Sequence, residues 1–209
     1  MKALIKKDLF MIKNNYKSFL IALIIYVFYA MEFKTNLVFF LPFMGLMSCI
    51  STLSYDDYNN FHTYAISFPK GKLGIVKSKY ITVILVVLIL SILGLLADFI
   101  VGNIIGNYEF MTSFEEIYVI FFVMLLMAAI MYPLLFKYGT EKGRIVLLLT
   151  GFIIAGLGIL LSKGLPLGKP NGIIIFIDKY FSYIASIVTI ILLTVSYFIS
   201  KKIYLKKEF

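Results

Sequence analysis

The stretch YDDYNNFHTYAISFPKGKLGIVKSKY, Tyr55 to Tyr80, is a long polar, aromatic-rich segment in an otherwise apolar chain of 209 residues. The runs on either side of it, Leu37–Tyr55 and Tyr80–Ala97, contain no charged residue. Because a helix rises 1.5 Å per residue, about 20 residues cross the hydrocarbon core of a bilayer. The pattern therefore predicts two membrane-spanning helices joined by a polar segment.

The composition of the whole chain agrees with this interpretation. Apolar residues make up 61% of the sequence and charged residues 15%, too few to cover one water-soluble core. Further uncharged apolar blocks predict an all-α integral membrane protein with a single domain over residues 1–209. The six expected spans cover about residues 18–33, 37–54, 78–102, 114–136, 144–162 and 180–200. The first is the shortest, and it crosses only if Lys17 and Glu32 extend to opposite surfaces.

The basic residues predict the orientation of these spans. If the N-terminus lies inside, 16 of the 20 Lys and Arg residues fall on the cytoplasmic side. Short cytoplasmic loops retain positive charge in this way, so we expect both termini in the cytoplasm. The net charge of +9 is then explained by topology and by attraction to anionic lipid, and no nucleic acid partner is expected.

The N-terminal segment, residues 1–17, has the pattern of an amphipathic helix lying on the membrane surface. One face gathers Ile5, Leu9, Ile12 and Tyr16, and lysines occupy an adjoining face. The alternative is a basic retention signal without regular structure. In either case the segment is expected to contact membrane lipid.

The segment after Tyr55 also has helical periodicity. Its apolar face contains Tyr58, Phe61, Ala65 and Phe68, with Tyr64 at the edge. Its polar face contains Asp56, Asn59, Asn60, Thr63 and Ser67. Because the residue before a proline avoids helical dihedrals, Phe68 ends the pattern. We therefore expect a short interfacial helix between spans two and three, which could contact a partner or rest on lipid headgroups.

The sequence lacks the motifs of several kinds of enzyme and metal site. There is no phosphate-binding loop for ATP, no zinc protease motif and no cluster of Cys and His. His62 is the only histidine and Cys49 the only cysteine, so no metal site is expected. A membrane enzyme would have to rely on Glu115, Glu116 or Asp98, which form no evident site. The chain is thus expected not to be an enzyme by itself.

Two segments resemble the permease subunits of ABC-2-type ATP-binding-cassette exporters. They are the basic amphipathic entry MKALIKKDLFMIKNNYKS, residues 1–18, and the Tyr55–Tyr80 segment. Within that family they look most like the small permeases of Gram-positive bacteria, and they are similar to those that export phenol-soluble modulins.

The resemblance implies a machine in the bacterial cell membrane. Asp56–Phe68 would be a coupling helix that docks on a separate P-loop ATPase, and ATP and Mg²⁺ would be bound by that ATPase, with no cofactor on this chain. The implied docking residues are Asp56, Asp57, Tyr58, Phe61, His62, Tyr64, Ala65 and Phe68. A second permease subunit, identical or different, would complete the pathway.

The cargo implied by the resemblance is an amphipathic or hydrophobic peptide, such as a modulin or a bacteriocin, moved outward. The alternative function is an immunity protein that binds such peptides in the membrane without transporting them. Both functions fit apolar spans that have no charged residue in their middle.

Overall fold

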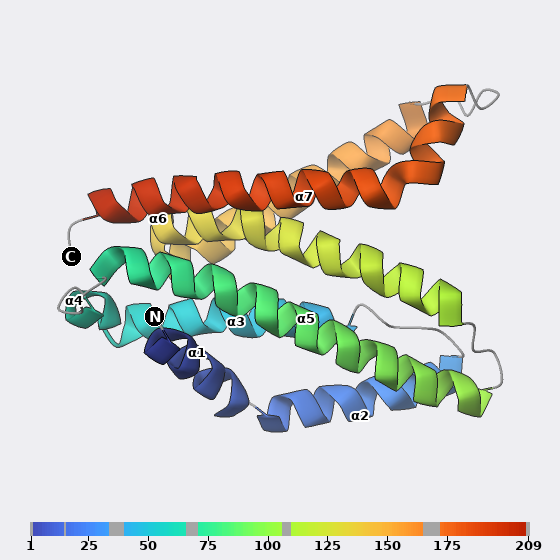
Figure 1. The fold of residues 1–209 in the computed structure, drawn as a ribbon, viewed down its shortest axis with the longest axis horizontal. Coiled ribbons are helices and arrows are strands. Elements are labelled where there is room, and N and C mark those ends of the chain that lie inside the picture. The colour runs from blue at the N-terminus through green and yellow to red at the C-terminus, as the bar shows by residue number, and fades with distance from the viewer. Residues whose placement is uncertain are drawn as a thin grey trace.

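The computed structural model describes residues 2–14, 16–33, 40–65, 71–105, 110–164 and 172–207, and the regular structure in these ranges is helical. The elements are α1 (Lys2–Asn14), α2 (Tyr16–Phe33), α3 (Phe40–Tyr58), α4 (Phe61–Ala65), α5 (Gly71–Ile105), α6 (Phe110–Gly164) and α7 (Gly172–Lys206) (Figure 1). The long helices lie side by side. The start of α1, the whole of α4 and the end of α7 lie at one end of the bundle, which we call the α4 end.

Three helical stretches are long and apolar enough to cross a membrane in the part of the chain that the structure describes. They are Gly71–Ile100, Thr112–Thr140 and Ser186–Lys206. These stretches coincide with the spans expected at 78–102, 114–136 and 180–200. The other three expected spans fall largely within α2, α3 and the later part of α6. The all-helical membrane fold is therefore confirmed, and the count of six spans and their orientation stay predictions.

Helix α1 differs from the expected surface helix because it packs on the protein. Its buried residues are Asp8 and Ile12, and it lies against α3 and α5. Ile5 and Leu9 are half-buried on the same side, whereas Phe10 is 65% exposed. The expected apolar face is present, but it contains a carboxylate and faces other helices. The side chain of Tyr16 lies outside the described part of the chain.

Helix α6 is interrupted at Gly139, whose φ of 78° and ψ of 172° are not helical. The chain turns there, so that α6 consists of two helices that meet at this glycine. A side chain at this φ would be strained, which explains why a residue without Cβ occupies the position. Two of the expected spans end at residue 136 and begin at residue 144, and most of the residues between them are helical in the structure, with this one-residue break.

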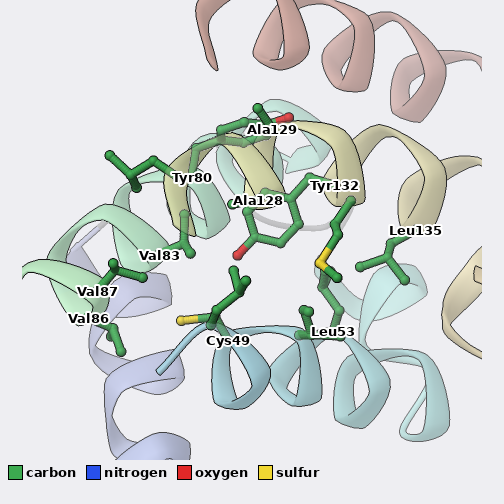
Figure 2. Packing of buried hydrophobic residues seen from close by; sticks show 14 of the residues in the cluster. Cys49, Leu53, Tyr80, Val83, Val86, Val87, Ala128, Ala129, Tyr132 and Leu135 are labelled. Carbon is green, nitrogen blue, oxygen red and sulfur yellow. The ribbon is translucent and has the colours of Figure 1, made fainter. Parts of the chain in front are cut away.

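The core lies where α3, α5 and α6 meet (Figure 2). Cys49 and Leu53 of α3 lie beneath Val83 of α5 and Tyr132 of α6. Small residues permit close approach: a Cβ added to Gly45 of α3 would lie 2.5 Å from Leu90 Cδ1 of α5. The Leu90 side chain thus packs directly on the backbone of α3, and close packing at small residues is a main source of helix association in membranes, where lipid tails are as apolar as the side chains.

A chain of hydroxyl groups joins α5, α6 and α7 within the core. Ser196 Oγ donates a hydrogen bond to the carbonyl of Ala129 at 2.5 Å. Since a serine has one hydroxyl hydrogen, the Tyr80 hydroxyl at 2.6 Å must donate to Ser196. Ser200 lies 2.9 Å from the same tyrosine oxygen and can donate to it. These bonds satisfy buried polar groups and tie three helices together.

Candidate functional site

The segment after α3 folds as a turn and a short helix, not as one helix over residues 56–68. Asn60 has a φ of 49°, in the left-handed region that asparagine tolerates better than most residues. This conformation ends α3 at Tyr58, and α4 starts at Phe61. Thr63 then donates its backbone N–H and its hydroxyl to the Asn60 carbonyl, at 3.2 and 2.7 Å. The expected helical wheel is therefore wrong across Asn59 and Asn60.

Two tyrosines around this turn are strongly exposed. Tyr58 is 85% exposed and Tyr64 66% exposed, although both are large and partly apolar. Phe61 is half-buried against the core, and its ring centroid lies 6.4 Å from that of Tyr64. Exposed tyrosines supported by a buried aromatic ring are typical of binding surfaces. We call the surface formed by Tyr58, Phe61 and Tyr64 the aromatic patch.

A cavity of about 710 Å³ opens beside the aromatic patch, between the end of α3 and the break in α6. Six of the nine lining residues carry a hydroxyl group, one carries a carboxylate and one an ammonium group, and aromatic rings and other apolar atoms complete the wall. The lining residues are Ser51, Ser54, Tyr55, Asp57, Tyr58, Tyr138, Gly139, Thr140 and Lys142. Its size and polarity suit an inserted side chain or turn of another protein better than an apolar small molecule.

Behind the aromatic patch lies a group of buried charges. Asp8, Asp56 and Lys79 are each 1% exposed, and they come from α1, α3 and α5. Lys79 Nζ lies 2.8 Å from Asp8 Oδ1 and 2.6 Å from Asp56 Oδ2, and donates to Thr52 Oγ1 at 3.0 Å. We call Lys7, Asp8, Asp56 and Lys79 the ionic cluster.

Lys7 completes the ionic cluster and connects it to α4. Its ammonium group donates to Asp56 Oδ1 and lies 3.4 Å from Asp8 Oδ1. The same ammonium group lies 3.7 Å from the centroid of the Phe61 ring, a cation–π contact. Two lysines thus balance two aspartates, which is the condition for burying such groups.

The cluster is not fully hydrogen-bonded. Asp8 Oδ2 is buried and accepts no hydrogen bond from a described residue. The pair between Asp56 Oδ2 and Lys79 is short, but its angles depart from hydrogen-bond geometry. Attraction between charges therefore holds the cluster together as much as directional bonding does.

The next residue, Asp57, faces a different helix. Its Oδ2 accepts a hydrogen bond from the backbone N–H of Thr140, at 3.1 Å. Thr140 is the first residue after the break at Gly139, where backbone N–H groups lack partners within the helix. Asp57 therefore caps the second helix of α6 from the end of α3, and its negative charge also suits a helix N-terminus.

The structure brings together some of the expected docking residues and separates others. Tyr58, Phe61 and Tyr64 form the aromatic patch, with Asp57 at the neighbouring cavity. Asp56 was expected on a polar, exposed face, but it is buried in the ionic cluster and its carboxylate is not accessible to a partner. Phe68 and the side chains of His62 and Ala65 lie outside the described part of the chain.

The sequence reasoning missed Asp8, Lys7 and Lys79. A signal for Asp8 was present, because it lies at helical spacing between Ile5 and Ile12 on the expected apolar face. A carboxylate among apolar residues indicates a buried ionic partner. Lys79 lies 71 residues after Asp8, and no sequence feature linked the two.

No metal-binding group of three or more His, Cys, Asp or Glu side chains forms among the described residues. Asp98, one of the carboxylates considered for a membrane enzyme, lies beside the start of α6 and is buried. It accepts a hydrogen bond from Ser113 Oγ at 2.5 Å. This contact fastens the end of α5 to the start of α6, away from the α4 end.

Comparison with known proteins gives one match. The sequence model of a family described as "ABC-2 family transporter protein" matches residues 3–205, which is nearly the whole chain. No curated protein and no solved structure matches it. The similarity to modulin exporters in particular stays a prediction.

Proposed function

Because this chain belongs to the ABC-2 transporter family, we propose that it is the membrane permease of an exporter whose α4 end docks on a separate ATPase. Family membership implies a permease subunit that works with an ATPase subunit. The chain has no phosphate-binding loop, so ATP and Mg²⁺ would be bound by that partner. The α4 end is then cytoplasmic, which agrees with the distribution of basic residues.

The observation on which the proposal rests is the aromatic patch beside the cavity. Tyr58 and Tyr64 are exposed, and Phe61 is packed from below by Lys7. Fixing the ring beneath the surface reduces the side-chain entropy that binding would otherwise cost. A rigid aromatic protrusion next to a polar hollow fits a protein partner with a complementary groove and a protruding turn.

We infer that the cargo is an amphipathic or hydrophobic peptide. The described spans contain buried hydroxyl groups such as Tyr80, Thr82 and Ser91, and their middle contains no ionisable Asp, Glu, Lys or Arg. Apolar helices with scattered hydroxyls suit an amphipathic molecule better than a small ion. A pathway between two permease copies would use the apolar faces that α5 and α7 expose in the single chain.

The docking proposal is tested by co-expressing the chain with candidate P-loop ATPase subunits from the same genome and purifying the tagged permease in detergent. Tyr58→Asp and Tyr64→Asp should each lower the recovered ATPase by about tenfold, as expected of interface hot spots. Tyr183→Asp is the matched control, since Tyr183 is 65% exposed on α7 and lies about 35 Å along that helix from Lys206, at the α4 end. Equal recovery with all three variants would rule out docking at the aromatic patch.

Transport is tested in inside-out vesicles that contain the permease and the ATPase, with a fluorescent amphipathic peptide as cargo. Uptake that requires ATP and stops with a hydrolysis-deficient ATPase supports export. Peptide that binds the vesicles equally without ATP would instead support the immunity function. If the wild-type chain binds no ATPase and transports nothing, the proposed function is wrong.

A further inference from the structure

The two acidic residues at the end of α3 face different helices. Successive residues on a helix point about 100° apart, so adjacent side chains contact different neighbours. Asp56 is directed into the ionic cluster with α1 and α5, and Asp57 caps the second helix of α6. Four elements of the bundle thus meet at two consecutive residues.

The Asp56 side of this junction is firmly held. Lys79 contacts carboxylates of both α1 and α3, and Lys7 contacts the same two carboxylates from the other side. Separating any of these helices would leave a buried charge without its partner, which is strongly unfavourable. We therefore expect α1, the end of α3 and the start of α5 to move as one body.

The Asp57 side connects this body to α6. Gly139 breaks α6, so the helix that begins at Thr140 can change direction independently of the first half. Its first N–H group is bound by Asp57, and its start must follow the end of α3. The contact lies in the wall of the cavity next to the aromatic patch.

Helix α4 is joined to the same junction by covalent and non-covalent links. Only Asn59 and Asn60 separate it from α3, and the Asn59 N–H still bonds to the Tyr55 carbonyl at 3.0 Å. The Phe61 ring rests against Lys7 of the ionic cluster. A displacement of α4 therefore acts directly on the cluster.

We propose that the acid pair Asp56–Asp57 is the coupling junction of the transporter: it transmits movement of the docked α4 to α1 and α5 through Asp56, and to the second half of α6 through Asp57. This inference rests on the proposed function. Asp56, Asp57 and Lys79 are positioning residues in this scheme, because none of them lies on the exposed aromatic patch.

The first test compares docking with coupling in the vesicle system that contains the ATPase. Asp56→Asn, inside the buried ionic cluster, should bind the ATPase as the wild type does. In Asp56→Asn and in Asp57→Ala, peptide transported per ATP hydrolysed should fall by about tenfold, within the range of coupling between distant sites. Asp57→Asn should keep most of this ratio, because its side-chain amide oxygen can accept the same hydrogen bond from the Thr140 N–H at the same reach. Lys77→Met, an exposed position on α5, is the control.

An unchanged ratio in both variants would overturn the inference while leaving the proposed function intact. A parallel loss of ATPase binding in Asp56→Asn would also overturn it, since this buried residue would then act on the docking surface and not on transmission. Failure of the wild-type chain to bind the ATPase would instead reject the proposed function. The ATPase-binding measurement on the variants separates the first result from the second, and the wild-type control separates both from the third.

A second test needs no change in the junction and serves if Asp56→Asn does not fold. Spin labels are placed on exposed positions of α1, α4 and α7 in a Cys49→Ala background, through Lys6→Cys, Thr63→Cys and Tyr183→Cys. On trapping the ATP-bound complex, the distance from α1 to α4 should stay constant while both change relative to α7. A change in the distance from α1 to α4 would contradict the proposal, because α4 would then move without carrying α1 with it.

Discussion

The α4 end and the middle of the bundle hold their helices together by different interactions. In the middle, α3 and α5 approach through Gly45 and Leu90, and α6 contributes the fully buried Ala128. At the α4 end, charged side chains lie between the helices. Apolar contact in the middle competes with equally apolar lipid, so only close packing favours association there. Buried charges lose their partners when the helices separate, which makes the contacts at the α4 end selective for one arrangement.

Removal of Lys79, at the α4 end, should lower the free energy of unfolding more than any change in the middle of the bundle. Lys79→Met leaves Asp8 and Asp56 buried without their main partner, and we expect a loss of about 3–5 kcal/mol in unfolding free energy. Thermal unfolding of the detergent-purified protein measures it. Lys77→Met, two residues away and exposed, should change stability little. Equal effects of the two substitutions would show that the ionic cluster contributes no special stability.

A substitution in the middle of the bundle should have a smaller effect. Gly45→Leu places side-chain atoms where Leu90 now lies, and overpacking of this kind costs about 1–3 kcal/mol. Combining it with Leu90→Ala should recover part of the loss, because the added volume then has space. The double-mutant cycle in the same unfolding assay measures this coupling. If the effects of the two substitutions on unfolding free energy simply add, position 45 of α3 and Leu90 of α5 are not in direct contact.

The break in α6 should be sensitive to backbone conformation alone. Gly139→Ala introduces a side chain with no neighbour within 4 Å, but at a φ of 78° that alanine avoids. Such strain costs about 1–3 kcal/mol. Unfolding of this variant is compared with that of Lys142→Ala, an exposed position in the same region. If Gly139→Ala is as stable as the control, the break does not require a left-handed residue.

The smallest effect is expected for the hydroxyl chain. Tyr80→Phe removes the bonds to Ser196 and Ser200 but keeps the ring, which packs edge-on against Tyr132 at 5.0 Å. Hydrogen bonds between membrane helices contribute about 0.6 kcal/mol on average. Calorimetry or chemical unfolding should find a change of this size. A loss as large as that of Lys79→Met would place the main polar stabilisation in the core instead of at the α4 end.

Much of the fold could be predicted from the periodicity of the sequence. The apolar blocks indicated membrane helices, and three of them coincide with long apolar helices of the structure. Tyr58, Phe61 and Tyr64 were assigned to one docking segment, and docking at these residues stays a prediction. The break at Asn60 was not, because a helical wheel assumes that every residue has helical dihedrals, and asparagine can leave them at small cost.

The sequence by itself determined the class of the protein, because the hydrophobicity of a segment and the charges that flank it do not depend on tertiary contacts. It also determined that an acid pair follows the second apolar block. Only the tertiary structure decided that Asp56 joins Lys79 and Asp8 while Asp57 caps Thr140. One helix defines the direction of each side chain, but the packing of distant helices chooses which charge or N–H group it meets.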